Sequence, residues 1–230
     1  MRVPESRDQG PLPPLLVLLT AMAGLVDSVS FLVLGNVFVA NMTGNIIFLG
    51  MGFGGSQGVA GKILLTALST TCFCVGAAVG GHLVFKGIAH RGRLLSAATS
   101  TQACALIATA LIVPGLGQVH ASDRRMAIAI LAVSMGWQYA IVRRLEVPDY
   151  RTVVVTTTLT ALVADRGQAR ERVVRRSLSI AALLLGAAVG ALLVRKVSVA
   201  APLWCAAVVL AVVAAVSFVT AHQPNADKWR

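Results

Sequence analysis

One carboxylic acid, Asp27, is placed where it could do chemistry inside a membrane. Nine acidic residues are present, and eight of them fall outside the long apolar segments, so Asp27 alone is embedded. A charged side chain at the centre of a bilayer costs about 2.5–3.5 kcal/mol on insertion scales and usually faces the protein interior. We therefore expect Asp27 either to bind a proton, a cation or a substrate group, or to make a structural hydrogen bond to residues 43–45.

A second feature is the apolar stretch 37–53, which is interrupted by polar residues in its middle. Non-helical backbone is tolerated at membrane depth only inside protein or beside a water-filled cavity. Short polar side chains can satisfy freed backbone groups and cap a half-helix over 46–53, whose N-terminus would attract anions. They either line one central pocket or merely cap a break. The predicted substrate or ion site consists of Asp27, Asn41, Thr43, Gly44, Asn45, Gln138, Thr156 and Thr158.

The elements that must position these residues are membrane helices. Of the 230 residues, 57% are hydrophobic and 13% are charged, against about 45–50% and 25% in soluble domains. A spanning helix needs about 20 mostly apolar residues. The fold class is therefore an all-α membrane protein with six transmembrane helices. These are predicted at 12–35, 62–85, 94–113, 126–142, 177–194 and 200–220.

The charge distribution separates six spans from eight. With six spans and both termini in the cytoplasm, 15 of the 20 Lys and Arg residues fall inside and 5 outside; treating 37–53 and 152–164 as spans gives 12 and 8. Cytoplasmic loops carry the excess of Lys and Arg, so both stretches are predicted to be broken or re-entrant. The net charge of +11 then needs no nucleic-acid partner. A signal peptide cleaved after 21–23 is the alternative for the N-terminus.

The two halves of the sequence resemble each other. The GAAVG segment at 76–80 returns at 186–190, and Gly24 and Asp27 align with Gly136 and Tyr139. Because each half holds three spans, the second copy is inverted, and inverted repeats with interrupted helices are typical of secondary transporters. Gly76, Gly80, Gly186 and Gly190 are predicted to be helix-packing residues. The predicted domains are a tail at 1–11, repeat one at 12–113, repeat two at 126–220 and a tail at 221–230.

These patterns favour a small secondary transporter or channel for an unknown small solute or ion. The alternative is a non-transporting membrane scaffold or assembly partner. An enzyme is disfavoured, because a lone embedded carboxylate lacks a second acid, a nucleophile–base pair or a metal set. We expect no cofactor, no metal site and no disulfide. The lipid bilayer is the expected partner, and a homo-oligomer is an open alternative to a monomer. The four cysteines are Cys72, Cys74, Cys104 and Cys205.

The motif AGLVD at 23–27, followed by VFVANMTGN at 37–45, resembles the YoaK family of small bacterial inner-membrane proteins. In the second half, Met135, Gly136, Gln138 and the Thr-rich stretch 152–160 extend this resemblance over essentially the whole chain. The resemblance implies a multi-span protein of the bacterial inner membrane and supplies no substrate. The chain departs from the family pattern at Thr157, where glycine is usual, and at Tyr139, where asparagine is usual.

Overall fold

The computed structural model describes residues 10–83, 90–113, 120–145, 147, 160 and 170–223, and its regular structure there is helical. Six helices are long and apolar enough to cross a membrane, which confirms the predicted all-α membrane class. The shorter helices are α2 (Met42–Phe53) and α3 (Gln57–Ala60). The long helices are α1 (Leu12–Leu32), α4 (Ile63–Ala78, continued by a π-helical turn at Val79–Leu83), α5 (Arg91–Ile112), α6 (Ala121–Arg144), α8 (Arg170–Lys196) and α9 (Ala201–Ala221).

Two spans continue past the C-terminal ends that the sequence predicted, because their helices extend beyond the last apolar residue into charged residues. α6 exceeds the expected 126–142 and ends at Arg144, and α8 exceeds 177–194 and ends at Lys196. The flexible stems of Lys and Arg lie along apolar surface while their charged heads reach the interface. Cations in a last turn also interact favourably with the helix dipole. The limits of the apolar stretch therefore underestimate the helix.

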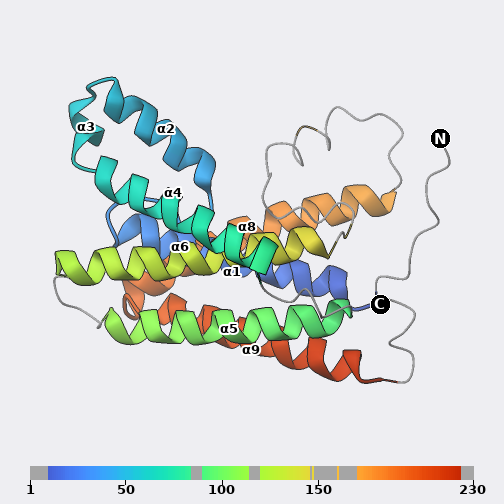
Figure 1. Cartoon of the computed structure of the whole chain (residues 1–230). Coiled ribbons are helices and arrows are strands. Elements are labelled where there is room, and N and C mark those ends of the chain that lie inside the picture. Colours follow the sequence, from blue (N-terminus) through green and yellow to red (C-terminus); the bar gives the residue numbers. More distant parts are fainter. Residues whose placement is uncertain are drawn as a thin grey trace.

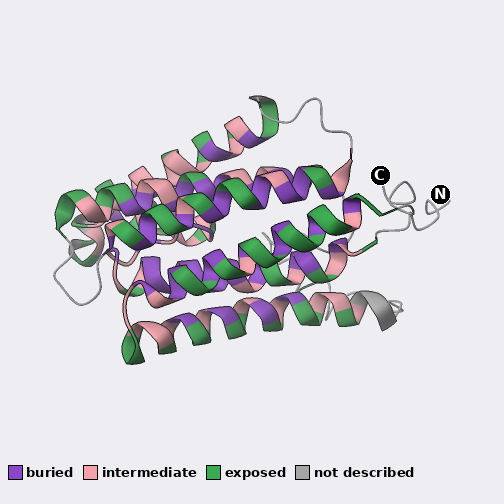
Figure 2. Ribbon diagram, turned by 90° about the horizontal axis from the view of Figure 1, so that it is seen from below, coloured by how far each residue is buried: buried purple, intermediate pink, exposed green. Residues whose placement is uncertain are grey.

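The six long helices form a bundle in which two are central, two are peripheral, and α5 and α9 are intermediate in burial. Buried residues make up 72% of the apolar window of α1 and 61% of that of α6, but only 22% of those of α4 and α8. The closest pairs are α1 with α8, α4 with α6, and α5 with α9; α5 also packs on α6, and α1 on α9. In Figure 1 the start of α1 and the end of α9 lie at the same end of this bundle. Figure 2 shows buried residues on the facing sides of the helices and exposed ones on their outer sides.

Glycines allow α1 and α8 to cross in backbone contact. A Cβ added to Gly24 would overlap the backbone of Leu183 and Ala187, and one added to Gly186 would overlap the carbonyl of Ala21. One added to Gly190 would overlap the hydroxyl of Ser28. Small residues permit this close approach, which gives van der Waals contact that drives helix association in lipid.

The crossing of α4 with α6 is built in the same way. A Cβ at Gly76 would overlap the backbone of Val133, and one at Gly136 would overlap the carbonyl of Phe73. Gly80 lies against Trp137 and Ala140 of α6. The predicted packing glycines therefore lie at two helix crossings, α1 with α8 and α4 with α6.

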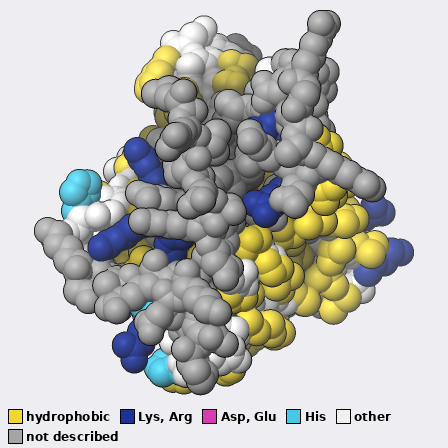
Figure 3. Space-filling view, turned by 90° about the vertical axis from the view of Figure 1, so that its right-hand side faces the viewer, with side chains coloured by type: hydrophobic (Ala, Val, Ile, Leu, Met, Phe, Trp, Pro, Cys, Tyr) yellow, Lys and Arg dark blue, Asp and Glu magenta, His cyan; other side chains and the backbone are white. Residues whose placement is uncertain are grey.

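The outward surface is apolar along the bundle and basic at its ends. Large aliphatic and aromatic side chains are exposed on α8 and α9, among them Leu184, Leu185, Val208 and Phe218. Such a surface suits lipid tails. The end of the bundle at which α1 begins and α9 ends, here named the Arg-rich end, has dark blue basic side chains around it in Figure 3. Its arginines in the described helices include Arg91, Arg93, Arg143, Arg144, Arg175 and Arg176.

The chain turns back sharply after α1 and then enters α2. Gly35 has φ +111° and Asn36 has φ +57°, a left-handed conformation that glycine and asparagine tolerate best. The amide of Asn36 donates to the carbonyl of Phe31 at 3.0 Å, and the hydroxyl of Ser30 donates to that of Val37 at 2.6 Å. The first bond satisfies a carbonyl group at the end of α1, and the second ties Val37, in the segment after the turn, to that helix.

The second interrupted stretch expected from the sequence, 152–164, lies outside the described residues except for Thr160. The half-helix expected at 46–53 begins earlier than predicted, at Met42. Thr43, Gly44 and Asn45 therefore lie in its first turn, and the non-helical backbone is confined to residues 33–41. The expected side-chain cap is also absent at Asn41, the N-cap residue, because its amide is directed elsewhere.

Candidate functional site

The carboxylate of Asp27 accepts four hydrogen bonds from the segment that follows α1. Its Oδ1 accepts from the backbone N–H groups of Val39 at 2.9 Å and Ala40 at 2.8 Å. Its Oδ2 accepts from the backbone N–H of Asn41 at 3.1 Å and from the Asn41 side-chain amide at 2.7 Å. Asp27 is 5% exposed. The acid thus replaces the helical partners that residues 39–41 lack.

This geometry places the sequence-predicted contact of Asp27 slightly upstream of residues 43–45. Consecutive N–H groups that converge on one carboxylate form charge-assisted hydrogen bonds, which are shorter and stronger than neutral ones. A buried N–H that lost its partner would cost about 1–3 kcal/mol. Asp27 therefore stabilises the break in the conformation seen, and both of its oxygens are engaged.

Asn45 makes a second set of bonds, to the backbone of Phe38. Its Oδ1 accepts from the Phe38 N–H at 2.9 Å, and its Nδ2 donates to the Phe38 carbonyl at 2.6 Å. The hydroxyl of Ser69, on α4, donates to the same carbonyl at 2.6 Å. One amide side chain thus replaces both backbone partners of Phe38, as the sequence predicted for the polar residues of this stretch, and α4 is tied to the break. Asp27, Asn41, Asn45, Ser69 and the backbone of residues 38–41 are together called the break network below.

The ring of Phe38 packs the break into the bundle. It stacks with Phe31 of α1 at a centroid distance of 5.0 Å and with Phe48 of α2 at 6.3 Å. A Cβ added to Gly44 would lie 2.8 Å from this ring, so the glycine makes room for it. Thr43, by contrast, is exposed. Of the polar residues predicted here, the structure brings Asp27, Asn41 and Asn45 inward and leaves Thr43 outside.

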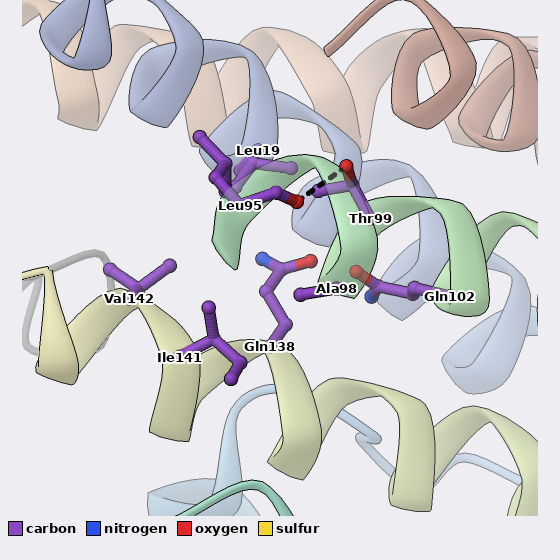
Figure 4. A pocket seen from close by; sticks show the side chains of 8 residues that line it. All are labelled: Leu19, Leu95, Ala98, Thr99, Gln102, Gln138, Ile141 and Val142. Carbon is purple, nitrogen blue, oxygen red and sulfur yellow. Dashed lines mark hydrogen bonds between the residues drawn. The ribbon is translucent and has the colours of Figure 1, made fainter. Parts of the chain in front are cut away.

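Gln138 lies in a different place, in a narrow gap between α1, α5 and α6 (Figure 4). The gap is too narrow for a water molecule. Asp27 is not among the residues that line it. Its lining residues are Leu19, Leu95, Ala98, Thr99, Gln102, Gln138, Ile141 and Val142, and it is called the amide gap below.

The amide of Gln138 reaches from α6 toward the face of α5 (Figure 4). Gln138 is 3% exposed, and its Oε1 is buried without a hydrogen-bond partner among the described residues. Across the gap, the amide of Gln102 donates at long range, to the Ser134 hydroxyl at 3.5 Å and to the Met135 sulfur at 3.6 Å. The Thr99 hydroxyl donates back to the Leu95 carbonyl at 2.8 Å. The amide gap therefore contains polar groups with unused hydrogen-bonding capacity.

The remaining predicted site residues, Thr156 and Thr158, lie outside the described residues. Tyr139, which aligns with Asp27 in the sequence repeat, is buried, packs against Phe73 at 5.4 Å and lies within electrostatic range of Asp27. His82 is exposed in the π-helical turn, with its Nδ1 3.2 Å from the Ala78 carbonyl. The four cysteines are free thiols.

Sequence reasoning missed Phe38 and Ser69 in the break network, Ser30 next to it and Ser134 beside the amide gap. A small hydroxyl in an apolar helix is a weak signal, because such residues often bond only to their own helix. Thr66, one turn before Ser69, does so, donating to the Lys62 carbonyl at 2.8 Å. The signal for Phe38 was its place between two other phenylalanines and next to the polar run, which indicates packing and not a backbone site.

Comparison with known proteins supports the architecture. A family model described as a protein of unknown function (DUF1275) matches residues 15–216. The UPF0700 transmembrane protein YoaK of Bacillus subtilis (strain 168) is 33% identical over 153 residues, which cover 66% of this chain. This chain spans 65% of the length of that relative. No solved structure matches.

The family match and the identity to YoaK confirm the resemblance found from the sequence motifs. The relative is named a transmembrane protein, which agrees with the six long apolar helices of this chain. Six such helices among the described residues, the family match over residues 15–216 and the 33% identity to YoaK lead to one conclusion: the chain is an integral membrane protein that belongs to the DUF1275 (UPF0700) family of unknown function.

Proposed function

We propose that this protein is a small secondary transporter or channel, built from two inverted three-helix repeats around a polar interior. The observation that carries the proposal is the correspondence of the two glycine crossings. Gly186 meets Ala21, and Gly76 meets Val133. Each pair is related to the other by the offsets of the sequence repeat, 110 residues for the glycines and 112 for their partners. Inverted repeats around an interior site are a recurring build of secondary transporters.

The other contacts at these crossings follow the same offsets. Gly24 meets Leu183 where Gly136 meets Phe73, and the helix pairs α1·α9 and α5·α6 correspond likewise. Under an inverted repeat, α5 and α9 would face each other across the symmetry axis, and they form a close pair. A duplication explains this full set of contacts, whereas chance similarity among Ala, Val and Gly residues would not reproduce the partners.

A re-entrant path for residues 33–53 belongs to the same proposal. α2 has 12 residues, about 18 Å at 1.5 Å per residue, which is too short to span a hydrocarbon core of about 30 Å. The hydrogen bonds to Asp27 hold residues 39–41 beside α1. Asp27 lies five residues before that helix ends at Leu32. Interrupted segments at membrane depth are a usual feature of transporter sites.

We further propose that the helices span the inner membrane of a bacterium and that the Arg-rich end faces the cytoplasm. Both termini would then be cytoplasmic. The arginine count at this end supports this orientation. We expect Arg144→Cys to resist a membrane-impermeant maleimide in intact cells, and Ser122→Cys, at the opposite end of α6, to react with it. The reverse labelling pattern would contradict the orientation.

A non-transporting scaffold remains the second candidate, and one observation favours it. Both oxygens of Asp27 are engaged, and the amide gap admits no water in this conformation. Under the transport proposal this conformation is a closed state, in which Asp27 positions the break. A role for Asp27 in binding a coupling ion would require some of its four hydrogen bonds to open. No catalytic role is proposed for it.

Flux across liposomes separates the two candidates. Purified protein is reconstituted, and the movement of protons, alkali cations and small neutral solutes is compared with that in protein-free liposomes. We expect at least one of these to move faster in the presence of protein. If none does, although the protein is inserted and folded, the scaffold is favoured. For a conducted proton, equal rates in wild type and in folded Asp27→Asn would reject a coupling role of the carboxyl.

A further inference from the structure

The amide gap carries an inference that goes beyond transport of an unspecified solute. It lies between α1, α5 and α6, where the two proposed repeats meet. Buried polar groups in proteins nearly always have hydrogen-bond partners, so that each exception calls for an explanation. The Oε1 of Gln138 is such an exception, because it is buried without a partner among the described residues while its amide is aimed across the gap.

The chemistry of the gap selects against ions. Its polar groups are the amides of Gln138 and Gln102 and the hydroxyl of Thr99, and its remaining walls are aliphatic. No charged side chain is among the described residues that line it. An ion that entered would lose its hydration without meeting an opposite charge, which is costly in an apolar environment. Asp27, the embedded acid, already spends both oxygens on the break network.

An amide side chain offers a donor and an acceptor side by side. The best complement to Gln138 is therefore a small planar solute that also presents an N–H donor next to a carbonyl acceptor and carries no net charge. Such a solute would form two parallel hydrogen bonds with the amide. It would supply the partner that Oε1 lacks, and the aliphatic walls would tolerate the rest of its surface.

We propose that the amide gap binds a small uncharged amide-like solute, with Gln138 as its hydrogen-bonding residue, and that Asp27 does not contact it. This inference rests on the proposed transport function. In the conformation seen the gap is closed, so that a bound solute requires the side chains of α5 and α6 to move apart.

The test uses two planar probes of nearly equal size, urea and guanidinium, which differ in charge. Both are applied at low, non-denaturing concentrations to proteoliposomes of the full chain, and vesicle volume is followed by stopped-flow light scattering. We expect urea to equilibrate at least tenfold faster than in protein-free liposomes, and guanidinium to show no acceleration. Gln138→Leu should abolish the acceleration of urea.

Stability provides a second readout that a structural role would move in the opposite direction. Gln138→Leu removes an unpartnered buried amide and keeps a similar shape, so we expect Tm in detergent to rise by roughly 2–4 °C. The matched control is Ser217→Ala on α9, which removes another buried polar group without a partner away from the gap. It should not lower Tm, and it should leave the movement of urea unchanged.

The outcomes separate the inference from the function on which it rests. If guanidinium or other ions move through the protein and urea does not, transport stands and the uncharged solute is rejected. If Gln138→Leu lowers Tm, the amide has a structural role and the inference fails. If neither urea nor any other solute or ion moves through the folded protein, both the inference and the proposed function fail.

Discussion

Replacing Asp27 by leucine is expected to destabilise the folded protein by at least about 3 kcal/mol, since three backbone N–H groups lose their acceptor and each costs about 1–3 kcal/mol when buried and unpaired. The three groups belong to Val39, Ala40 and Asn41. The stability of Asp27→Asn should lie between those of wild type and the leucine variant. Its side-chain amide keeps one acceptor oxygen, but its two N–H donors would face groups that are themselves donors. Thermal unfolding in detergent, followed by the loss of monodisperse protein, measures the order of the three proteins.

Thr43→Val is the matched control for the Asp27 variants. Thr43 belongs to the same polar run but is exposed, so the loss of its hydroxyl should change Tm by no more than a degree or two, in keeping with the small effect of most surface substitutions. Wild-type stability in Asp27→Leu would show that the four hydrogen bonds are not what holds the break. Such a result would shift the role of the carboxyl toward ion binding.

Adding one methyl group at Gly186 or Gly76 is expected to cost about 1–3 kcal/mol or more, because overpacking forces packed groups apart. At both positions the new Cβ would overlap backbone and not a movable side chain: that of Ala21 for Gly186 and that of Val133 for Gly76. Backbone cannot rotate away, so the two helices must separate. We expect Gly186→Ala and Gly76→Ala to lower Tm in detergent by similar amounts, since the two crossings correspond.

Gly50→Ala serves as the control for both glycine variants. Gly50 lies within α2, and nothing lies within 4 Å of a Cβ built there. Alanine is favoured over glycine within a helix by about 0.5–1 kcal/mol, so this variant should be as stable as wild type or slightly more stable. Strong destabilisation at only one of Gly186 and Gly76 would argue against equivalent crossings.

The sequence was sufficient for the coarse architecture because the bilayer imposes it. Six apolar segments and the distribution of arginines predicted six helices, and the structure has six of spanning length. Helix ends were predicted less well. The predicted spans ended before Arg144 and Lys196 because these residues are charged, but both belong to their helices. Long basic side chains can reach the interface from a buried backbone.

The sequence singled out polar residues of the break network but not the hydrogen bonds that connect them. Asp27 was singled out because it is the embedded acid, and Asn41 and Asn45 because amides interrupt an apolar run. Their partners could not be predicted, since a three-dimensional turn at Gly35 and Asn36 decides which backbone groups meet Asp27. Gln138 was assigned to the same pocket as Asp27, but the structure places it between α1, α5 and α6. Periodicity places a residue on a face and does not identify the helix opposite.

The pairing of the helices also constrains how the protein can assemble. α4 packs mainly on α6, and α8 mainly on α1, while α1, α4 and α5 have little mutual contact. The first three spans therefore form few contacts with one another. Their main interfaces form only with later spans of the chain. The bundle is complete only when α8 lies beside α1 and α9 beside α5, so the two halves are interlocked and we expect neither to fold when separated from the other.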